Sequence, residues 1–397
     1  MPGHGPKLCP RISAQQDAVR WDNDKLYLDS LARMQLATAA ATWCNAYEAG
    51  FEDLFLARRS SADWADVMVR ARQAGASHFT FATSGSTGAR RFIRHREEVL
   101  AAEAQAWVQV LTQLISQAQC KPVNRVIVLA PTHHIYGFIW GVLLPMALGV
   151  PALDADLAAL PCLEAGDLMV AVPDQWAWLS QSCLSPHDWP EAVYGVSSTA
   201  PLASQVHRVM TEQGMVGCGR PALRYLLQIY GSSETAGLAW RTDPDNPYTL
   251  APGRNRGSEG GVSLQLPDCS WVTLPIQDQI GWVSGTDFHL EGRADQSVQV
   301  AGHNVSPQWV AGELMRHPCV KQAVVRLNTR AEPARLKAFV VLNQPCTSQQ
   351  CAELEAWAIE QLPWYAAPGS ISYGVELPRN ALGKACDWPD DIKALCS

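Results

Sequence analysis

Short apolar runs rich in β-branched and aromatic residues recur along the chain, and each ends in a turn or a polar cluster. Stretches of helical character, such as 97–117, separate them. Runs of this length that alternate with helices predict a mixed or parallel sheet with covering helices. The expected fold class is therefore α/β. The runs are HFTFAT from His78, RVIVLAP from Arg125, LMVAVP from Leu168, AVYGVSS from Ala192 and LRYLLQIYG from Leu223.

The pattern of apolar and glycine residues changes twice toward the C-terminus. Beyond Pro252, the segments GGVSLQL, WVTLPI and GWVSGTDF alternate and are punctuated by glycine, which predicts a smaller antiparallel unit. After Asp295, VKQAVVRL, LKAFVVLN and the helix-like CAELEAWAIEQL form an α+β pattern of about 100 residues, the size of a small domain. We expect a large N-terminal domain over 1–294, mainly helical up to Ala76, and a small C-terminal domain over 295–397.

Charge and composition exclude some classes of partner. The chain has 397 residues and a net charge of −7. Nucleic acids and anionic membranes select a basic face, so neither is an expected partner. The N-terminal stretch has no apolar core, which predicts a cytoplasmic location. The segment IYGFIWGVLLPMALGVPAL from Ile135 is interrupted by glycine and proline, and it predicts a buried helix rather than a membrane span.

Cysteine is frequent, with 12 residues, but its spacing is irregular. No C-x-x-C pair occurs, so the pattern predicts neither a zinc site nor a disulfide framework. We expect the cysteines to be small buried hydrophobic residues.

A loop rich in glycine and hydroxyl side chains follows the strand-like run HFTFAT. It reads TSGSTG from Thr83 and leads into the basic run ARRFIRH. The GxxxxGK[ST] pattern of a P-loop is absent. Successive backbone N–H groups of such a turn can still surround an anion, and Ser and Thr hydroxyls add donors. Taken alone, the loop fits a phosphate site and an ordinary connection equally well.

Six further motifs follow the loop along the chain. They are PTHHIYG from Pro131, SSTAPL from Ser197, YGSSETAG from Tyr230, GWVSGTD from Gly281, GRADQSVQVAGHNVSP from Gly292 and LPRNALGK from Leu377. In their order and spacing, the loop and these motifs resemble the adenylate-forming superfamily, which includes acyl- and aryl-CoA synthetases, peptide-synthetase adenylation domains and luciferases. SSTAPL and GSSETAGLAWR look more specifically like the short bacterial AMP-ligases of aryl polyene and xanthomonadin-type pathways.

The resemblance implies a nucleotide site. Glu234 matches a Mg²⁺-binding carboxylate, and magnesium is usually held by one or two carboxylates plus phosphate oxygens. Asp287 matches an acid that accepts hydrogen bonds from the ribose hydroxyls, and Arg293 matches a second nucleotide contact. The residues that match the loop around the β- and γ-phosphates are Thr83, Ser84, Gly85, Ser86, Thr87 and Gly88. The other implied nucleotide contacts are Thr199, Ala200, Pro201, Tyr230, Gly231, Ser232 and Ser233.

Catalysis and domain motion are also implied by the resemblance. Lys384 matches a mobile lysine between the carboxylate and the α-phosphate, where a point charge stabilises the transition state. Asp295 matches the hinge about which the small domain rotates after adenylation. His134 matches a histidine beside the acyl pocket, although a histidine alone is more often structural. The remaining implied pocket residues are Tyr136, Ser198, Tyr230 and Gly231.

The chain departs from the family pattern at particular points. Arg90 and Arg91 stand where the family has Pro-Lys, so a bidentate guanidinium replaces a point charge. Gln299 replaces a lysine of the motif that follows the hinge, which puts one contact of the thioester step in question. The region before the phosphate loop is much shorter than in the family, which implies an abbreviated first subdomain.

The implied activity is ATP-dependent activation of a carboxylic acid to acyl-AMP with release of pyrophosphate, followed by transfer to a thiol. ATP and Mg²⁺ are the expected cofactors, and the acceptor is CoA or the phosphopantetheine of an acyl carrier protein. Tyr136 and Tyr230 can supply flat apolar walls, so we expect an aryl acid, hydroxybenzoate-like or cinnamate-like.

Two alternatives stay open. A fatty or β-hydroxy acyl-CoA ligase would need a tunnel, which Gly137 and Gly141 could open. A catalytically inactive nucleotide-binding regulator would fit the short N-terminal region, but the presence of Glu234, Asp287 and Lys384 together argues against it.

Overall fold

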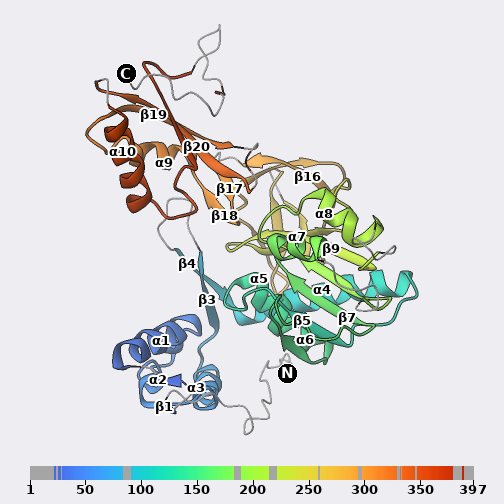
Figure 1. The fold of residues 1–397 in the computed structure, drawn as a ribbon. Helices are drawn as coiled ribbons and strands as arrows, with labels where there is room; N and C mark the ends of the chain where they lie inside the picture. Colours follow the sequence, from blue (N-terminus) through green and yellow to red (C-terminus); the bar gives the residue numbers. More distant parts are fainter. Residues whose placement is uncertain are drawn as a thin grey trace. The chain divides into compact units, whose positions relative to one another are not determined.

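A computed structural model gives the fold of the chain (Figure 1). It describes residues 22–23, 26–27, 29–83, 91–182, 189–213, 221–257, 260–293, 297–328, 331, 333–344, 347–378 and 387–388. The chain divides into two compact units. The first comprises 1–82, 92–275 and 282–288, and the second comprises 83–91, 276–281 and 289–397.

A nine-stranded sheet with the order β15-β16-β11-β10-β9-β8-β7-β5-β6 is the largest element of the described chain. The strands β5 to β9 pair in parallel, and β9, β10, β11 and β16 pair antiparallel. The prediction of a mixed α/β sheet is confirmed. The strands are β5 Arg125–Val128, β6 Ala152–Asp154, β7 Asp167–Ala171, β8 Tyr194–Ser197, β9 Tyr225–Ser232, β10 Ala236–Arg241, β11 Tyr248–Leu250, β15 Asp278–Trp282 and β16 Asp287–Arg293.

Helices cover both faces of the parallel strands, because alternate strand residues enter two separate cores. Val126 and Val128 pack in one core with α4, α5 and α6, whereas Ile127 packs in the other with α7. The helix α4 matches the predicted range 97–117. These helices are α4 Glu97–Gln117, α5 Ile135–Phe138, the π-helix η2 Ile139–Leu143, α6 Leu144–Leu148, α7 Pro173–Gln181, α8 Ser204–Arg208 and the π-helix η4 Val209–Gln213.

The apolar segment that begins at Ile135 forms α5, η2 and α6 inside this core, so the prediction of a buried helix is confirmed. Among the described residues, no helix combines the length and the apolar character that a membrane span requires.

The N-terminal region is helical, as predicted, and leads into a hairpin. Asp29 accepts a hydrogen bond from the backbone of Ala32 at the start of α1, and Ser60 caps α3 in the same way. The elements are β1 Asp22–Asn23, β2 Leu26–Tyr27, α1 Ser30–Trp43, the 3₁₀ helix η1 Ala46–Glu48, α2 Leu54–Ala57, α3 Ser61–Gln73, β3 His78–Thr83 and β4 Arg91–Arg96.

The antiparallel unit expected beyond Pro252 is smaller than the sequence suggests. It contains β12 Arg254–Arg256, β13 Val262–Gln265 and β14 Trp271–Thr273. The segment GWVSGTDF belongs to β15 and β16 of the nine-stranded sheet instead. The reason is packing: Phe288 is fully buried against Tyr230 and Tyr248 of that sheet.

The second unit has its own apolar core and the α+β pattern that the sequence predicts. Its three-stranded sheet has the order β19-β20-β21, in which β20 and β21 run parallel. A domain boundary between 294 and 295 stays a prediction. The elements are β17 Val298–Val300, β18 His303–Val305, α9 Pro307–Leu314, β19 Val320–Asn328, β20 Arg335–Leu342, α10 Ser348–Gln361 and β21 Ser370–Gly374.

Candidate active site

Three of the motifs meet at the carboxyl ends of the parallel strands. The segment that contains His134 follows β5, the segment Ser198–Pro201 follows β8, and β9 ends in the turn that carries Glu234. Open α/β sheets bind ligands outside the carboxyl ends of their strands, because the loops there converge. We call this side of the sheet the carboxyl edge.

The turn between β9 and β10 holds Glu234 at the carboxyl edge. The Ser232 hydroxyl accepts hydrogen bonds from the backbone N–H groups of Glu234 and Thr235, each at 3.2 Å. The Ser232 backbone N–H in turn donates to Thr235 Oγ1 at 3.0 Å. Within the described part of the chain, the half-buried carboxylate of Glu234 makes no ion pair. A hard oxygen donor without a competing cation fits Mg²⁺, which needs only one or two protein carboxylates beside a phosphate group.

His95 on β4 supports the same turn, a role that its place at the end of the basic run ARRFIRH did not indicate. Its Nε2 lies 2.7 Å from the Ser233 carbonyl oxygen. Burial lowers the pKa of the ring, while the Ser233 carbonyl and the Glu234 charge oppose that shift. A neutral ring that carries its proton on Nε2 donates to Ser233, so His95 fixes the backbone beside Glu234.

Asp287, the first residue of β16, has a hydroxyl donor on each carboxylate oxygen. Thr249 Oγ1 donates to Oδ1 at 2.8 Å, and Ser284 Oγ donates to Oδ2 at 2.8 Å. Thr249 also faces Asp287 in the strand register. The half-buried carboxylate is therefore held in one orientation and can still accept further hydrogen bonds.

Two predicted pocket residues have hydroxyls that bind the backbone. Tyr136 is buried, and its hydroxyl lies 2.8 Å from the Val196 carbonyl oxygen and 3.1 Å from that of Ala171. Burial raises its pKa well above the usual value. The Ser198 hydroxyl donates to the Ile229 carbonyl at 3.0 Å. The Tyr136 hydroxyl thus links the ends of β7 and β8, and the Ser198 hydroxyl links the residue after β8 to β9.

The other described residues differ in exposure. His134 is exposed at the start of α5, with its ring centroid 4.3 Å from that of His133. Thr199 is exposed and has a left-handed backbone (φ 81°), Ala200 is half-buried and Pro201 is exposed. Half-buried Tyr230 packs edge-on against Phe288 with ring centroids 5.8 Å apart, and Gly231 follows it in β9.

Some predicted site residues lie outside the described residues. Thr83 ends β3 and Arg293 ends β16, but their side chains are not described. Ser84 to Gly88, the hinge residue Asp295 and Lys384 fall outside the described ranges altogether. Their roles stay predictions.

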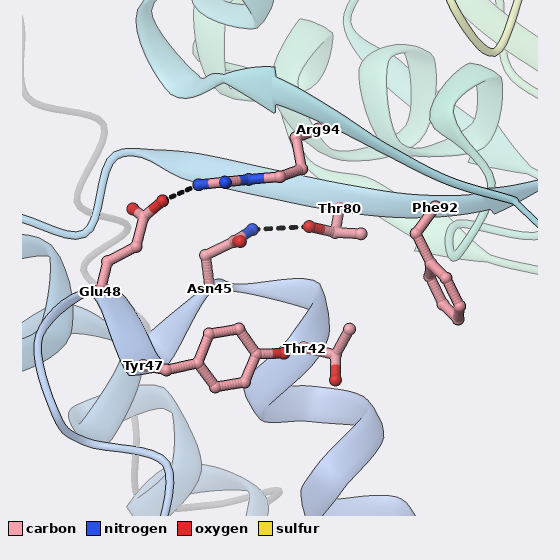
Figure 2. Close-up of a pocket in the computed structure, with 7 residues that line it drawn as sticks. All are labelled: Thr42, Asn45, Tyr47, Glu48, Thr80, Phe92 and Arg94. Carbon is pink, nitrogen blue, oxygen red and sulfur yellow. Dashed lines mark hydrogen bonds and ion pairs between the residues drawn. The ribbon is translucent and has the colours of Figure 1, made fainter.

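A cavity of about 370 Å³ lies between the end of α1, η1 and the β3–β4 hairpin (Figure 2). Inside it, Asn45 Nδ2 donates to Thr80 Oγ1 at 2.7 Å, and Arg94 pairs with Glu48. None of the predicted site residues lines it. The lining residues are Thr42, Asn45, Tyr47, Glu48, Thr80, Phe92 and Arg94.

Known proteins resemble this chain in sequence and in fold. The model of the AMP-binding enzyme family matches residues 29–261. A 4-coumarate–CoA ligase from Cereibacter sphaeroides is 34% identical over 97% of this chain and 89% of its own length. A 4-coumarate–CoA ligase from Halorhodospira halophila is 35% identical over 92% of this chain and 89% of its own.

Among solved structures, an amide bond synthetase from Marinactinospora thermotolerans superimposes with a TM-score of 0.56 at 18% identity, over 77% of this chain and 67% of that one. An o-succinylbenzoate CoA synthetase double mutant from Bacillus subtilis gives 0.55 at 16% identity and the same coverage. These two likenesses concern the fold. Because the family model covers more than half of the chain and the relatives match nearly all of it, the chain belongs to the AMP-binding enzyme family, the adenylate-forming superfamily that its motifs indicate, and is an AMP-forming acid–thiol ligase.

Proposed function

We propose that the chain activates an aryl acid of the hydroxycinnamate type with ATP and transfers the acyl group to the thiol of CoA. The observation that carries this proposal is the match over nearly the whole chain with relatives named 4-coumarate–CoA ligase. The substrate class expected from the sequence extended from hydroxybenzoates to cinnamates, and these relatives favour the cinnamate end of that range. An acyl carrier protein is the alternative acceptor.

The reaction has two steps. A carboxylate oxygen of the acid attacks the α-phosphorus of ATP, an acyl-AMP bond forms and pyrophosphate leaves. The thiolate of CoA then attacks the acyl carbonyl, a thioester forms and AMP leaves. Magnesium, when bound, would supply positive charge beside the phosphate oxygens.

The residues of the carboxyl edge have distinct parts in this proposal. Glu234 would hold the metal ion, and Asp287 would accept hydrogen bonds from the ribose hydroxyls through the two oxygens that Thr249 and Ser284 orient. The loop from Thr83 to Gly88 would bind the β- and γ-phosphates. Arg293, and the side chains around Thr199 to Pro201, would complete the nucleotide site.

Domain motion belongs to the same proposal. Residues 1–294 would bind ATP and the acid, and residues 295–397 would rotate about Asp295 between the two steps. Lys384 would stabilise the charge that develops on the α-phosphate during the first step.

Packing near the proposed acid pocket favours an aryl substrate over a fatty acid. A methyl group added at Gly141 would lie 2.7 Å from Val128 Cγ1, and one added at Gly137 would lie 2.2 Å from the Pro131 carbonyl oxygen. These glycines therefore allow α5 and η2 to approach their neighbours closely, and they open no space for an alkyl tunnel. The buried Tyr136 ring and the half-buried Tyr230 ring would supply flat walls instead.

Pyrophosphate release with a panel of acids tests the substrate. The panel contains 4-hydroxycinnamate, cinnamate, 4-hydroxybenzoate, benzoate and a medium-chain fatty acid. We expect 4-hydroxycinnamate to give the highest kcat/KM, because a site that hydrogen-bonds a ring hydroxyl rejects its absence strongly. A fatty acid that outperforms every aryl acid would overturn the proposal. Parallel assays with CoA and with a phosphopantetheinylated carrier protein identify the acceptor.

The role of Lys384 has a separate test. Lys384→Ala should slow pyrophosphate exchange by about 10²–10³-fold, the usual cost of removing one transition-state contact. Transfer from pre-formed acyl-AMP to CoA should continue at the wild-type rate. Equal loss in both half-reactions would contradict the assignment.

A further inference from the structure

A buried ion pair contacts the start of β10, just after the turn that carries Glu234. Glu103 of α4 and Arg254 of β12 approach to 3.2 Å between Oε2 and Nη2, and each side chain is only 3% exposed. No sequence motif includes either residue, and the activity proposed above assigns neither a role.

The pair binds the backbone of Gly237 from both sides. Gly237 N–H donates to Glu103 Oε1 at 2.8 Å, and the Gly237 carbonyl accepts from Arg254 Nη2 at 2.9 Å. Trp107 Nε1 also donates to Glu103 Oε1, at 3.0 Å, which fixes the carboxylate.

Glu103 and Arg254 bind Gly237 at a point where β10 has no paired strand on the side opposite β9. The register of β11 begins at Ala239 and Trp240, and the register of β10 on β9 shifts between Gly237 and Ala239. Glu103 and Arg254 therefore give Gly237 the donor and acceptor that a strand would otherwise supply. The approach is close enough that a Cβ at this position would lie 2.7 Å from Glu103 Oε1.

Burial works against both charges of the pair. Burial raises the pKa of Glu103 and lowers that of Arg254, and in each case burial outweighs the attraction of the partner. Both shifts go toward the neutral forms, so both charges are costly to bury. Buried pairs of this kind can often be replaced by apolar residues with little loss of stability. Their specific contribution here is the geometry of the Gly237 backbone.

Strand pairing and a hydrogen bond connect the Gly237 backbone to the turn that carries Glu234. Gly237 faces Gly231 in the register, and Ala236 faces Ser232. The Ser232 hydroxyl then holds the backbone N–H of Glu234. A displacement of Gly237 would therefore move the start of β10 and change the direction of the Glu234 carboxylate.

We propose that Glu103 and Arg254 are positioning residues that hold Gly237 and thereby orient Glu234 toward the bound metal–nucleotide. The part that concerns the metal rests on the proposed function. The part that concerns the Gly237 backbone does not.

The main test replaces the pair by Glu103→Met together with Arg254→Met. The matched control is Arg125→Met with Asp167→Met, which removes another ion pair, at the amino ends of β5 and β7. Three quantities are measured without turnover: the Tm, amide hydrogen exchange of the peptide 231–240, and binding of Mg·ATP by calorimetry over a range of Mg²⁺ concentrations.

We expect the Glu103/Arg254 double variant to stay folded, with a lower Tm than the wild type, because the buried Gly237 backbone and Trp107 Nε1 lose their hydrogen-bond partners. Exchange in the peptide 231–240 should accelerate about 10-fold or more, because the Gly237 amide loses its acceptor. The Mg²⁺ concentration for half-maximal binding should rise about 10-fold, a usual cost of losing an outer-shell contact. The control should leave exchange in this peptide and Mg²⁺ dependence unchanged. A folded double variant with wild-type exchange and wild-type Mg²⁺ dependence would overturn the proposal.

Two single substitutions of Glu103 test the positioning of Gly237 even if the double variant fails to fold. Glu103→Gln keeps a carbonyl oxygen that can accept from Gly237, whereas Glu103→Leu does not. We expect slow exchange in the Gln variant and fast exchange in the Leu variant, and equal exchange in the two would contradict the proposal. If the wild type releases no pyrophosphate with any acid, the proposed function fails, while the exchange data still judge the positioning of Gly237.

Discussion

The two ends of the parallel strands use buried charge in different ways. At the amino ends, Arg125 and Asp167, the first residues of β5 and β7, form a bidentate pair with contacts of 2.9 and 2.6 Å. Asp167 also accepts from the backbone of Glu164 at 2.7 Å. At the carboxyl edge, Glu103 and Arg254 direct their remaining contacts to the backbone of a third residue, Gly237.

The difference separates a structural pair from a pair that serves a site. The amino-edge pair binds one strand to its neighbour and closes a loop. The carboxyl-edge pair shapes a strand start next to Glu234, whose carboxylate has no ion pair within the described residues. Among the described residues, the Arg125–Asp167 pair is thus satisfied at one edge, and the Glu234 carboxylate is available at the other, the edge where open α/β sheets bind ligands.

The largest expected effect comes from the available charge itself. Glu234→Gln keeps the size of the side chain and removes its charge, so pyrophosphate release should fall by about 10²–10³-fold. The Mg²⁺ concentration for half-maximal activity should rise at the same time. Rates measured across a magnesium titration check this, and a titration curve that matches the wild type would refute the metal role.

At the amino edge, substitution should affect stability and leave catalysis intact. Asp167→Asn breaks the bidentate pair and should lower the free energy of unfolding by about 2–3 kcal/mol, somewhat less than for a fully buried pair. The cost is limited because Arg125 is 21% exposed and retains Glu164 at 3.5 Å. Urea unfolding measures the loss. A change in Mg²⁺ dependence would show that the two edges are not independent.

A methyl group at Gly237 should change both the stability of the fold and the Mg²⁺ dependence of the enzyme. Its carbon would lie 2.7 Å from Glu103 Oε1 and from Trp107 Cζ2, so one of these side chains must move. We expect Gly237→Ala to lower the free energy of unfolding by about 1–3 kcal/mol, the usual cost of overpacking. The Mg²⁺ dependence should shift in the direction seen for the Glu103/Arg254 variant. Unfolding curves and the magnesium titration together test this, and a loss of stability alone would argue that Gly237 only fills space.

The smallest effect should come from buried His207 on α8, which contacts β9. Its Nε2 lies 3.1 Å from the Leu226 carbonyl oxygen of β9. Burial lowers its pKa, against smaller opposing effects of Leu226, Asp243 and Glu212. The unfolded chain therefore binds this proton more tightly, and the stability that neutral His207 contributes is present above the unfolded pKa of about 6.5 and lost as the pH falls through the folded pKa.

His207→Gln provides the measurement, because a glutamine amide can still donate to Leu226. Between about pH 7.5 and 5.5, on either side of the usual histidine pKa, the Tm of the wild type should fall more than that of the variant. The Mg²⁺ dependence of the two should be the same. If the curves of Tm against pH are parallel for the wild type and the variant, His207 does not contribute to the acid sensitivity of the fold.

Local patterns in the sequence were enough to predict the main parallel strands, the helix 97–117 and the family. Apolar runs such as RVIVLAP and LMVAVP became buried parallel strands, and 97–117 became α4, because both depend on local periodicity. The ordered motifs identified an adenylate-forming enzyme, and Glu234 and Asp287 were recognised as site candidates from them. The expectation that the cysteines are small buried residues is confirmed for Cys44 and Cys351. It is wrong for Cys162 and Cys269, which are exposed in loops, and Cys120 and Cys319 are half-buried.

The residues that support the site can be identified only once the chain is folded. Nothing in the sequence indicated that β16 would join the large sheet, that His95 would hold Ser233, or that Glu103 and Arg254 would meet at Gly237. Each of these contacts joins segments that are far apart in the chain, and none leaves a local pattern. Periodicity specifies which face of an element is buried, whereas the partner that a buried polar group finds depends on how the elements pack.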